Sequence, residues 1–239
     1  MIVGIHQPNY FPWMGYFDKM DISDTFILLD EVQLTDSSMT QRNRVLNRNG
    51  VPAYLTVAFQ KTGYMQKQLR EIELNHEVDW QKRQIDFLKG TYGKTPYFGE
   101  VFELIEPILT KRYHTLIEVN YDAICLIKDM LEIPTKLVWQ SELDYPRDAH
   151  KNDMIVNLCK SVSADIYLSG TGAQKYMDPD SFAQNGIRVE FQDFVMPRYE
   201  QIYAEEFCSG LSILDVLLNC GIEGTKQLFR QRQQKGQKI

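Results

Sequence analysis

Residues that could take part in catalysis or ligand binding follow the ends of short apolar segments that are expected to be buried strands. These residues are His6, Asp30, Ser141 and the pair Ser169-Gly170. If the strands run parallel, their carboxyl ends share one edge of a sheet, which is where open α/β sheets bind ligands. His6 and Asp30 are the candidate catalytic residues, because a histidine titrates near neutral pH and a carboxylate accepts protons. The structural alternatives are a histidine that bonds the loop backbone and an aspartate that orders its loop.

The loop after His6 is not composed like an ordinary connector, which would be rich in Ser, Asp, Asn and Gly. It combines two prolines with several aromatic residues in the segment His6-Gln7-Pro8-Asn9-Tyr10-Phe11-Pro12-Trp13-Met14-Gly15-Tyr16. The prolines restrict the path of the backbone and remove two donors. This composition predicts a loop of defined shape that binds a substrate, with contacts from Gln7, Asn9, Tyr10 and Trp13.

A glycine-containing turn is a second candidate for ligand binding. It reads Ser169-Gly170-Thr171-Gly172-Ala173-Gln174-Lys175 and is predicted to connect a strand to a helix. Backbone N–H groups near glycines and at a helix N-terminus can bind phosphate. Ser169, Gly170 and Lys175 are therefore candidate phosphate contacts, and a plain strand–helix turn is the alternative. The turn has neither the dinucleotide-binding GxGxxG pattern nor the GxxxxGK[ST] pattern of a P-loop.

Two further sets of polar residues suit ligand binding. Arg42 and Asn43 could hold a phosphate or carboxylate, because the arginine side chain binds such groups bidentately. The alternative for them is a solvated face of a hairpin. Tyr199 and Gln201, after Pro197, form a polar aromatic patch that could bind a sugar or simply pack a loop.

The order of the predicted elements indicates an α/β fold with a mostly parallel sheet flanked by helices, of the Rossmann-like kind. Strands are predicted at 1–5, 25–29, 135–139, 166–168 and 187–191, and helices at 13–22, 152–162 and 211–218. A β-hairpin is predicted over 43–59, turning at Asn49-Gly50. Apolar residues at helical spacing predict a helical insertion at about 77–132. We expect one α/β domain over residues 1–225 and a basic, mobile tail over 226–239.

Composition narrows the class of function. The chain has 239 residues and a net charge of −6, which disfavours binding to duplex nucleic acid. No apolar run is long enough to span a membrane, and a cytoplasmic location is expected. The four cysteines are widely spaced, so they are expected to be reduced thiols, and no metal-ligand motif is present. The sequence names no cofactor and does not indicate an oligomeric state.

Several of these motifs together resemble the WbqC-like protein family. The resemblance rests on the opening segment, on Gln41-Arg42-Asn43-Arg44, on Tyr167-Leu168-Ser169-Gly170, on Pro197-Arg198-Tyr199-Glu200-Gln201 and on Leu211-Ser212-Ile213-Leu214-Asp215. It spans residues 1–221. A fainter similarity is to nucleotidylyltransferases, but Trp13 and Tyr16 stand where that group has the two histidines of its HxGH motif. Adenylyl transfer through those histidines is therefore excluded.

The resemblance implies a role in bacterial surface polysaccharide (O-antigen or lipopolysaccharide) biosynthesis. It suggests a transferase that acylates or aminoacylates a nucleotide-linked amino sugar, with a small, phosphate-bearing substrate. The alternative is a non-catalytic protein of the same pathway that binds a nucleotide sugar or a partner enzyme. An aminoacyl donor carried by tRNA stays open as a partner. One departure from the family pattern is Met154, which occupies a position where an arginine is expected.

Overall fold

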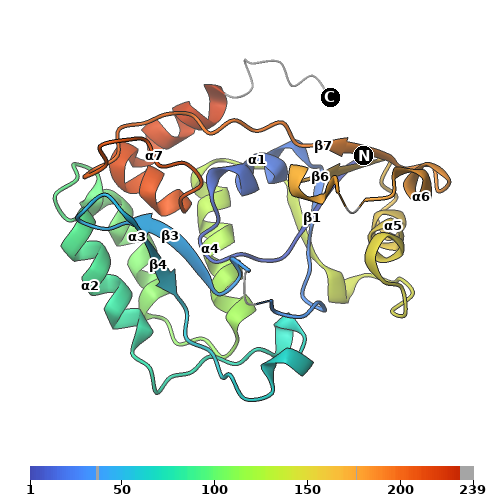
Figure 1. Ribbon diagram of the computed structural model, residues 1–239, viewed down its shortest axis with the longest axis horizontal. Helices are drawn as coiled ribbons and strands as arrows, with labels where there is room; N and C mark the ends of the chain where they lie inside the picture. The colour runs from blue at the N-terminus through green and yellow to red at the C-terminus, as the bar shows by residue number, and fades with distance from the viewer. Residues whose placement is uncertain (36–37, 176, 232–239) are drawn as a thin grey trace. The chain divides into compact units, whose positions relative to one another are not determined.

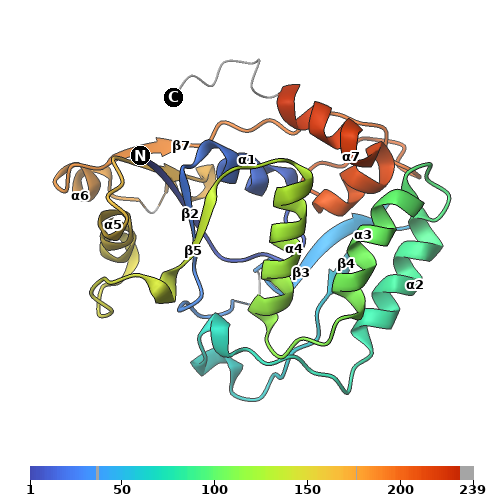
Figure 2. The ribbon, with the colours of Figure 1, turned by 180° about the vertical axis from the view of Figure 1, so that it is seen from behind.

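The computed structural model describes residues 1–35, 38–175 and 177–231, and Figures 1 and 2 show it from two opposite sides. The chain divides into two compact units, each assembled from several segments of sequence. The first unit contains Met1–Gln7, Tyr16–Glu31 and Ile133–Phe194. The second contains Pro8–Gly15, Val32–Glu132 and Val195–Ile239.

The first unit contains a five-stranded parallel sheet, which confirms the predicted α/β fold. Its strands lie in the order β5-β2-β1-β6-β7. Their bounds are β1 Ile2–His6, β2 Thr25–Leu28, β5 Lys136–Trp139, β6 Ile166–Ser169 and β7 Arg188–Phe191. The strand order reverses between β1 and β6. Such a reversal is the switch point at which open α/β sheets bind their ligands, outside the carboxyl ends of the strands.

Alternating side chains of this sheet form an apolar core with two helices. Val3 and Ile5 of β1 pack with Val156 and Cys159 of α5 (Lys151–Ser161) and with Phe182 of α6 (Pro179–Ala183). The two helices are neighbours (Figure 1). Burial of Cys159 agrees with the expectation of a reduced core thiol. A third helix, α1 (Met14–Ile22), connects β1 to β2.

The second unit contains the predicted hairpin and helices. The hairpin consists of β3 (Arg42–Leu46) and β4 (Pro52–Thr56). The helices are α2 (Trp80–Tyr92), α3 (Phe98–Thr110), α4 (Leu116–Met130) and α7 (Ile213–Gln231). Asp79 caps α2 and a capping box formed by Thr115 and Glu118 begins α4, so local signals fix both helix starts. No helix of the described residues is long and apolar enough to cross a membrane.

One helix differs from the sequence prediction. Helix α7 was expected to end at residue 218, but it continues through a kink at Gly221 to Gln231. The first part of the basic stretch, 226–231, is therefore helical, and 232–239 lie outside the described residues. The turn predicted to connect β6 to a helix contains a 3₁₀ turn, Thr171–Ala173, and the α-helix that follows it starts at Pro179. Proline favours the first helical position, so it suits this helix start.

The hairpin turn is longer than the two-residue type that Asn49-Gly50 predicts. The amide of Asn47 donates to Val51 O at 2.9 Å, and the side chain of Asn47 accepts from the amides of Asn49 and Val51. Gly50 takes a left-handed conformation, with φ of 70°. A Cβ atom on Gly50 would lie 2.2 Å from the carbonyl oxygen of Tyr203, so both conformation and packing require glycine.

A pair of glycine substitutions separates these two requirements. Gly63 has the same φ of 70°, but nothing lies within 4 Å of the position that a Cβ atom on Gly63 would take. We expect Gly63→Ala to lower the free energy of unfolding by about 1 kcal/mol through backbone strain alone. Gly50→Ala should cost at least about 2 kcal/mol because overpacking adds to the strain. Urea denaturation of both variants measures this, and equal losses would contradict the close approach of Tyr203.

Candidate functional site

The candidate site lies at the carboxyl edge of the parallel sheet, where β1 and β6 separate. The two strands pair only as far as Gly4 and Leu168, and β1 continues through Ile5 and His6 beside β2. The carbonyl group of His6 faces β2, where it accepts from the amide of Leu29. Because successive carbonyl groups of a strand point to opposite sides, the carbonyl group of Ile5 faces the β6 side. The side chain of Lys19 reaches this carbonyl group from α1, and its Nζ donates to Ile5 O at 2.7 Å.

Lys19 is a buried cation at this switch point. Its side chain is only 4% exposed, and removal from water lowers the pKa of the amine to about 7. Within the described part of the chain, no carboxylate lies within ion-pair distance of Nζ. The rings of Phe26 and Tyr167 lie 5.9 Å from it and supply weak cation–π attraction. A buried cation without a counter-ion costs free energy, and an anionic ligand would offset that cost.

His6 lies beside this lysine at the end of β1. Its Nδ1 is 3.0 Å from Gln7 O, and because a carbonyl oxygen only accepts, Nδ1 must carry the proton. Nε2 is then the lone-pair nitrogen. The ring of Tyr16 packs edge-on against the imidazole, and the Tyr16 hydroxyl also donates to Gln7 O. Burial, and then the Lys19 charge, lower the pKa of His6 to about 4, so the imidazole is neutral at pH 7.

Asp30 orders the neighbouring strand end. Its carboxylate accepts from the amide of Ser141 at 3.0 Å and from the Ser141 hydroxyl at 2.6 Å, and the residue is 3% exposed. The adjacent Glu31 pairs with Arg147 and accepts from Tyr145. These contacts fix the segment after β5. The structural alternative that the sequence left open for Asp30, a loop-ordering carboxylate, describes the observed contacts.

Met154 lies near this segment as well. Its sulfur is 3.6 Å from the side-chain nitrogen of Gln140, and Gln140 also donates to the Tyr145 hydroxyl at 2.6 Å. At the position where the family pattern expects an arginine, this chain therefore has a methionine whose thioether contacts Gln140 within the first unit.

The turn after β6 offers open backbone. Ser169 is buried, whereas Lys175 is exposed. Neither Gly170 nor Gly172 has a positive φ, and nothing lies within 4 Å of a Cβ atom built on either one. Neither the conformation nor the packing of the described residues requires these glycines. The free space beside the backbone is what close approach of a phosphate needs.

Asn9, Tyr10 and Trp13 of the opening loop lie in the second unit, where buried side chains hold the loop backbone. The Asn43 amide nitrogen donates to Tyr10 O and Phe11 O, and its oxygen accepts from the Arg44 amide. The amide nitrogen of Asn120 donates to Pro8 O. Phe11 has an unusual φ of 37°, which this scaffold maintains.

The side chains of that loop are held as well. The Tyr10 hydroxyl donates to Gln84 of α2 at 2.7 Å, and Asn9 accepts from the Thr40 hydroxyl at 3.3 Å. Trp13 lies across Gly15, where a Cβ atom would be 2.4 Å from the indole. Arg42 stacks over the ring of Tyr54 at 4.5 Å. Among these predicted contacts, Asn9, Tyr10 and Asn43 are buried, and Trp13 and Arg42 are partly exposed.

Tyr199 and Gln201 bind a carboxylate that the sequence analysis missed. Asp215 of α7 is fully buried and accepts from the hydroxyls of Tyr92 and Tyr199, at 2.5 and 2.6 Å, and from Gln201 Nε2 at 3.2 Å. Burial raises the pKa of the Asp215 carboxyl. The polar aromatic patch is thus an internal hydrogen-bond network that fastens the segment before α7.

The structure therefore places the predicted residues in two groups. His6, Gln7, Asp30, Ser169, Gly170 and Lys175 belong to the first unit, and Asn9, Tyr10, Trp13, Arg42, Asn43, Tyr199 and Gln201 belong to the second. Sequence reasoning missed Lys19; the available signal was a lysine within an otherwise apolar helical face directly after β1. No group of three or more potential metal ligands occurs among the described residues.

Burial of Lys19 makes a prediction about stability. An amine whose pKa falls from 10.5 to about 7 on folding destabilises the fold as pH drops through that interval, because the unfolded chain takes up the proton first. We expect Lys19→Met to raise the free energy of unfolding by about 1–4 kcal/mol at pH 6.5. The gain should shrink toward pH 10. Denaturation across this pH range measures it, and a pH-independent loss of stability would contradict the uncompensated charge.

The protonation state of His6 is measurable directly. Nitrogen-15 NMR of the imidazole should show the neutral Nδ1–H tautomer at pH 7 and a titration midpoint near 4, since burial and Lys19 disfavour the cation. The resonance is assigned by its loss in His6→Gln. A midpoint near 6.5 would contradict the buried position beside a cation.

Comparison with known proteins supports the resemblance that the motifs indicated. The model of the WbqC-like protein family matches residues 7–227. A protein of Mycobacterium tuberculosis (strain ATCC 25618 / H37Rv), described as uncharacterized protein Rv1507c, is 33% identical over 233 residues, which cover 97% of this chain and 99% of that protein. No solved structure gives a significant match. The chain belongs to the WbqC-like protein family.

Proposed function

We propose that this protein is a transferase of bacterial surface polysaccharide biosynthesis that acts on a nucleotide-linked amino sugar. The observation that carries the proposal is the buried Lys19 ammonium at the switch point of the sheet, bonded to Ile5 O at 2.7 Å and adjacent to His6. A cation in that place suits the phosphate of an activated sugar. The polysaccharide setting and the acyl or aminoacyl transfer follow from the family resemblance.

Phosphate binding would change the chemistry of both basic groups. An anion close to Lys19 favours the charged form of the amine and raises its pKa from about 7. The same anion raises the pKa of His6 from about 4. The substrate would therefore convert His6 from a weak base into one better matched to neutral pH. Backbone groups at Ser169 and Gly170, and the side chain of Lys175, complete the phosphate contacts in this proposal.

The transfer step uses Nε2 of His6 as the base. The amine of the sugar attacks the carbonyl carbon of the activated acyl donor, a new C–N bond forms, and the bond to the leaving group of the donor breaks. Nε2 accepts the proton that the amine loses. Asp30 acts as a positioning residue, because its carboxylate holds Ser141 at the neighbouring strand end.

The second candidate is a non-catalytic protein that binds the same nucleotide sugar. The low pKa of His6 favours it, since this imidazole is a weak base in the free protein, and the Asp30 carboxylate is already bonded to Ser141. Both candidates require an anion at Lys19, and only the transferase requires His6 to accept a proton.

Proton uptake on binding tests the anion site. At pH 8 an amine with a pKa near 7 is mostly neutral, so binding of UDP-glucosamine should take up as much as one proton per site. Calorimetry in Tris and in HEPES, which differ in ionisation enthalpy, measures that uptake. Lys19→Met should abolish the uptake and weaken binding by at least about tenfold. Lys160→Met, at an exposed position on α5, is the matched control and should behave as wild type.

Turnover then separates the two candidates. With an activated acyl donor present, His6→Ala should lose at least about a hundredfold in rate, and Asp30→Ala should lose less. Full retention of turnover in both variants would contradict the assigned roles. Binding of UDP-glucosamine by the wild-type protein without turnover of any acyl donor would favour the non-catalytic candidate. Binding without proton uptake would contradict the placement of the anion at Lys19.

A further inference from the structure

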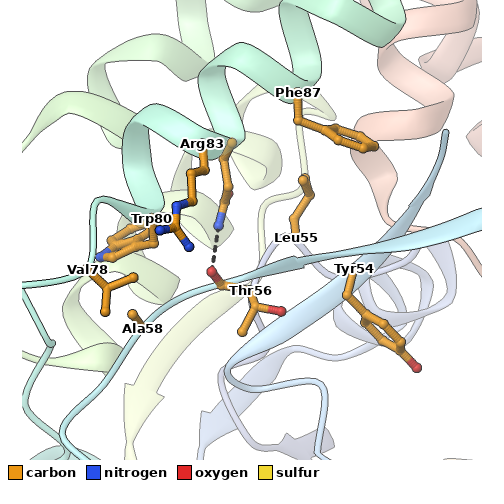
Figure 3. A pocket seen from close by; sticks show the side chains of 9 residues that line it. Tyr54, Leu55, Thr56, Ala58, Val78, Trp80, Arg83 and Phe87 are labelled. Atoms are coloured by element: carbon orange, nitrogen blue, oxygen red, sulfur yellow. Dashed lines mark hydrogen bonds between the residues drawn. The ribbon is translucent and has the colours of Figure 1, made fainter. Parts of the chain in front are cut away.

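The second unit has a groove between β4 and α2 that the proposed transferase chemistry does not use. One cavity of about 350 Å³ is lined by residues of both elements (Figure 3). A cavity of about 460 Å³ lies against the segment that follows β4 and shares Thr56, Ala58 and Val78 with the first. Both volumes fall in the range of small-molecule sites. We call the two cavities together the β4–α2 groove.

The chemistry of the groove is aromatic and cationic. Its aromatic side chains are Tyr54, Phe59, Trp80 and Phe87, and its cations are Lys61 and Arg83. Among the described residues, no acidic side chain lines either cavity, although the whole chain carries a net charge of −6. Arg83 is exposed, and its guanidinium group makes no hydrogen bond or ion pair with the described residues. The groove is therefore complementary to an anion that also presents a ring face.

The walls of the groove are fixed before any ligand binds. Gln84 of α2 donates to Thr56 O at 3.0 Å and accepts from the Tyr10 hydroxyl, so it joins the helix to the strand (Figure 3). Trp80 packs edge-on against Tyr10, with ring centroids 6.5 Å apart. Arg42 holds the Tyr54 ring by stacking on it. A preformed site costs less ordering entropy on binding.

The same contacts argue against a peptide adding to the edge of β4. Pro52 has no N–H group to donate, and Gln84 already occupies the outward carbonyl of Thr56. Side chains that can bond sugar hydroxyls, by contrast, occur along the groove: Thr56, Gln60, Thr62 and Asn75. Rings with hydroxyl groups and one anionic substituent match this combination of aromatic, polar and cationic side chains.

We propose that the β4–α2 groove binds an anionic saccharide, with the carboxylate or phosphate of the sugar on Arg83 and the ring against the aromatic side chains. Carboxylate and phosphate share the geometry that an arginine side chain binds bidentately. This site is separate from the one proposed at Lys19, and neither proposal depends on the other.

Titrations followed by amide NMR test the proposal in the full-length protein. The probes are methyl β-D-glucuronide, which carries a carboxylate, α-D-glucose 1-phosphate, which carries a phosphate, and neutral methyl β-D-glucoside. Saturable shifts are expected at the amides of Thr56 and Gln84, and not at those of His6 and Ser169. Arg83→Gln should weaken binding of the anionic probe by about tenfold. Lys82→Gln is the matched control, because this neighbouring exposed lysine pairs with Asp86 outside the groove.

The titrations can either support or overturn the proposed saccharide site. Saturation by one or both anionic sugars, with loss in Arg83→Gln alone, supports the site and identifies the preferred anion. Three results would overturn it: no saturable shift at Thr56 and Gln84 with either anionic probe, equally tight binding of methyl β-D-glucoside, or equal losses in the two variants. Proton uptake by UDP-glucosamine at Lys19 is measured separately, so failure of one site leaves the other intact.

Discussion

The first unit is organised around the ammonium group of Lys19, which bonds the carbonyl of Ile5 where β1 leaves β6. The pairing of β1 with β6 ends at Gly4, so the Ile5 carbonyl needs another donor on that side. Here a buried cation takes the place of the missing β6 donor. That contact also sets the electrostatics of the site, because the charge lies beside His6 and lowers its pKa to about 4. The bonding of the Ile5 carbonyl, the protonation of the histidine and the attraction for an anion thus depend on one buried lysine.

The polar residues of the second unit serve mainly to hold backbone. Asn43 bonds the carbonyls of the opening loop, and Tyr199 and Gln201 bond Asp215. Hydrogen-bonded groups of this kind tolerate burial because most of their polar atoms have a partner. The bonds of Asn43 maintain a loop whose Phe11 has a strained φ, and Gln84 braces α2 against β4. A rigid scaffold of this kind is what a preformed groove requires.

The sequence predicted the sheet, the hairpin and most helices, because apolar runs and helical periodicity follow directly from burial. It also placed His6, Asp30 and Ser169 at strand ends, since parallel strands bring those ends to one edge. It could not distinguish a ligand contact from an internal bond at Asn43 or Gln201, because both uses need the same amide. The sequence did not predict the role of Lys19, because its burial depends on the point at which the pairing of β1 with β6 ends. That point is a property of the assembled sheet and not of the local sequence. The glycines after β6 indicated a strand–helix connection, and the helix that follows, α6, starts at Pro179.

The central claim is that Lys19 is a buried amine poised to bind an anion. The most direct measurement is the titration of its Nζ by NMR, assigned from the resonance that Lys19→Met removes. The account predicts a midpoint near 7 in the free protein, lowered by burial, and a higher midpoint when UDP-glucosamine is bound. A midpoint near 10.5 that does not change with the nucleotide sugar would contradict it.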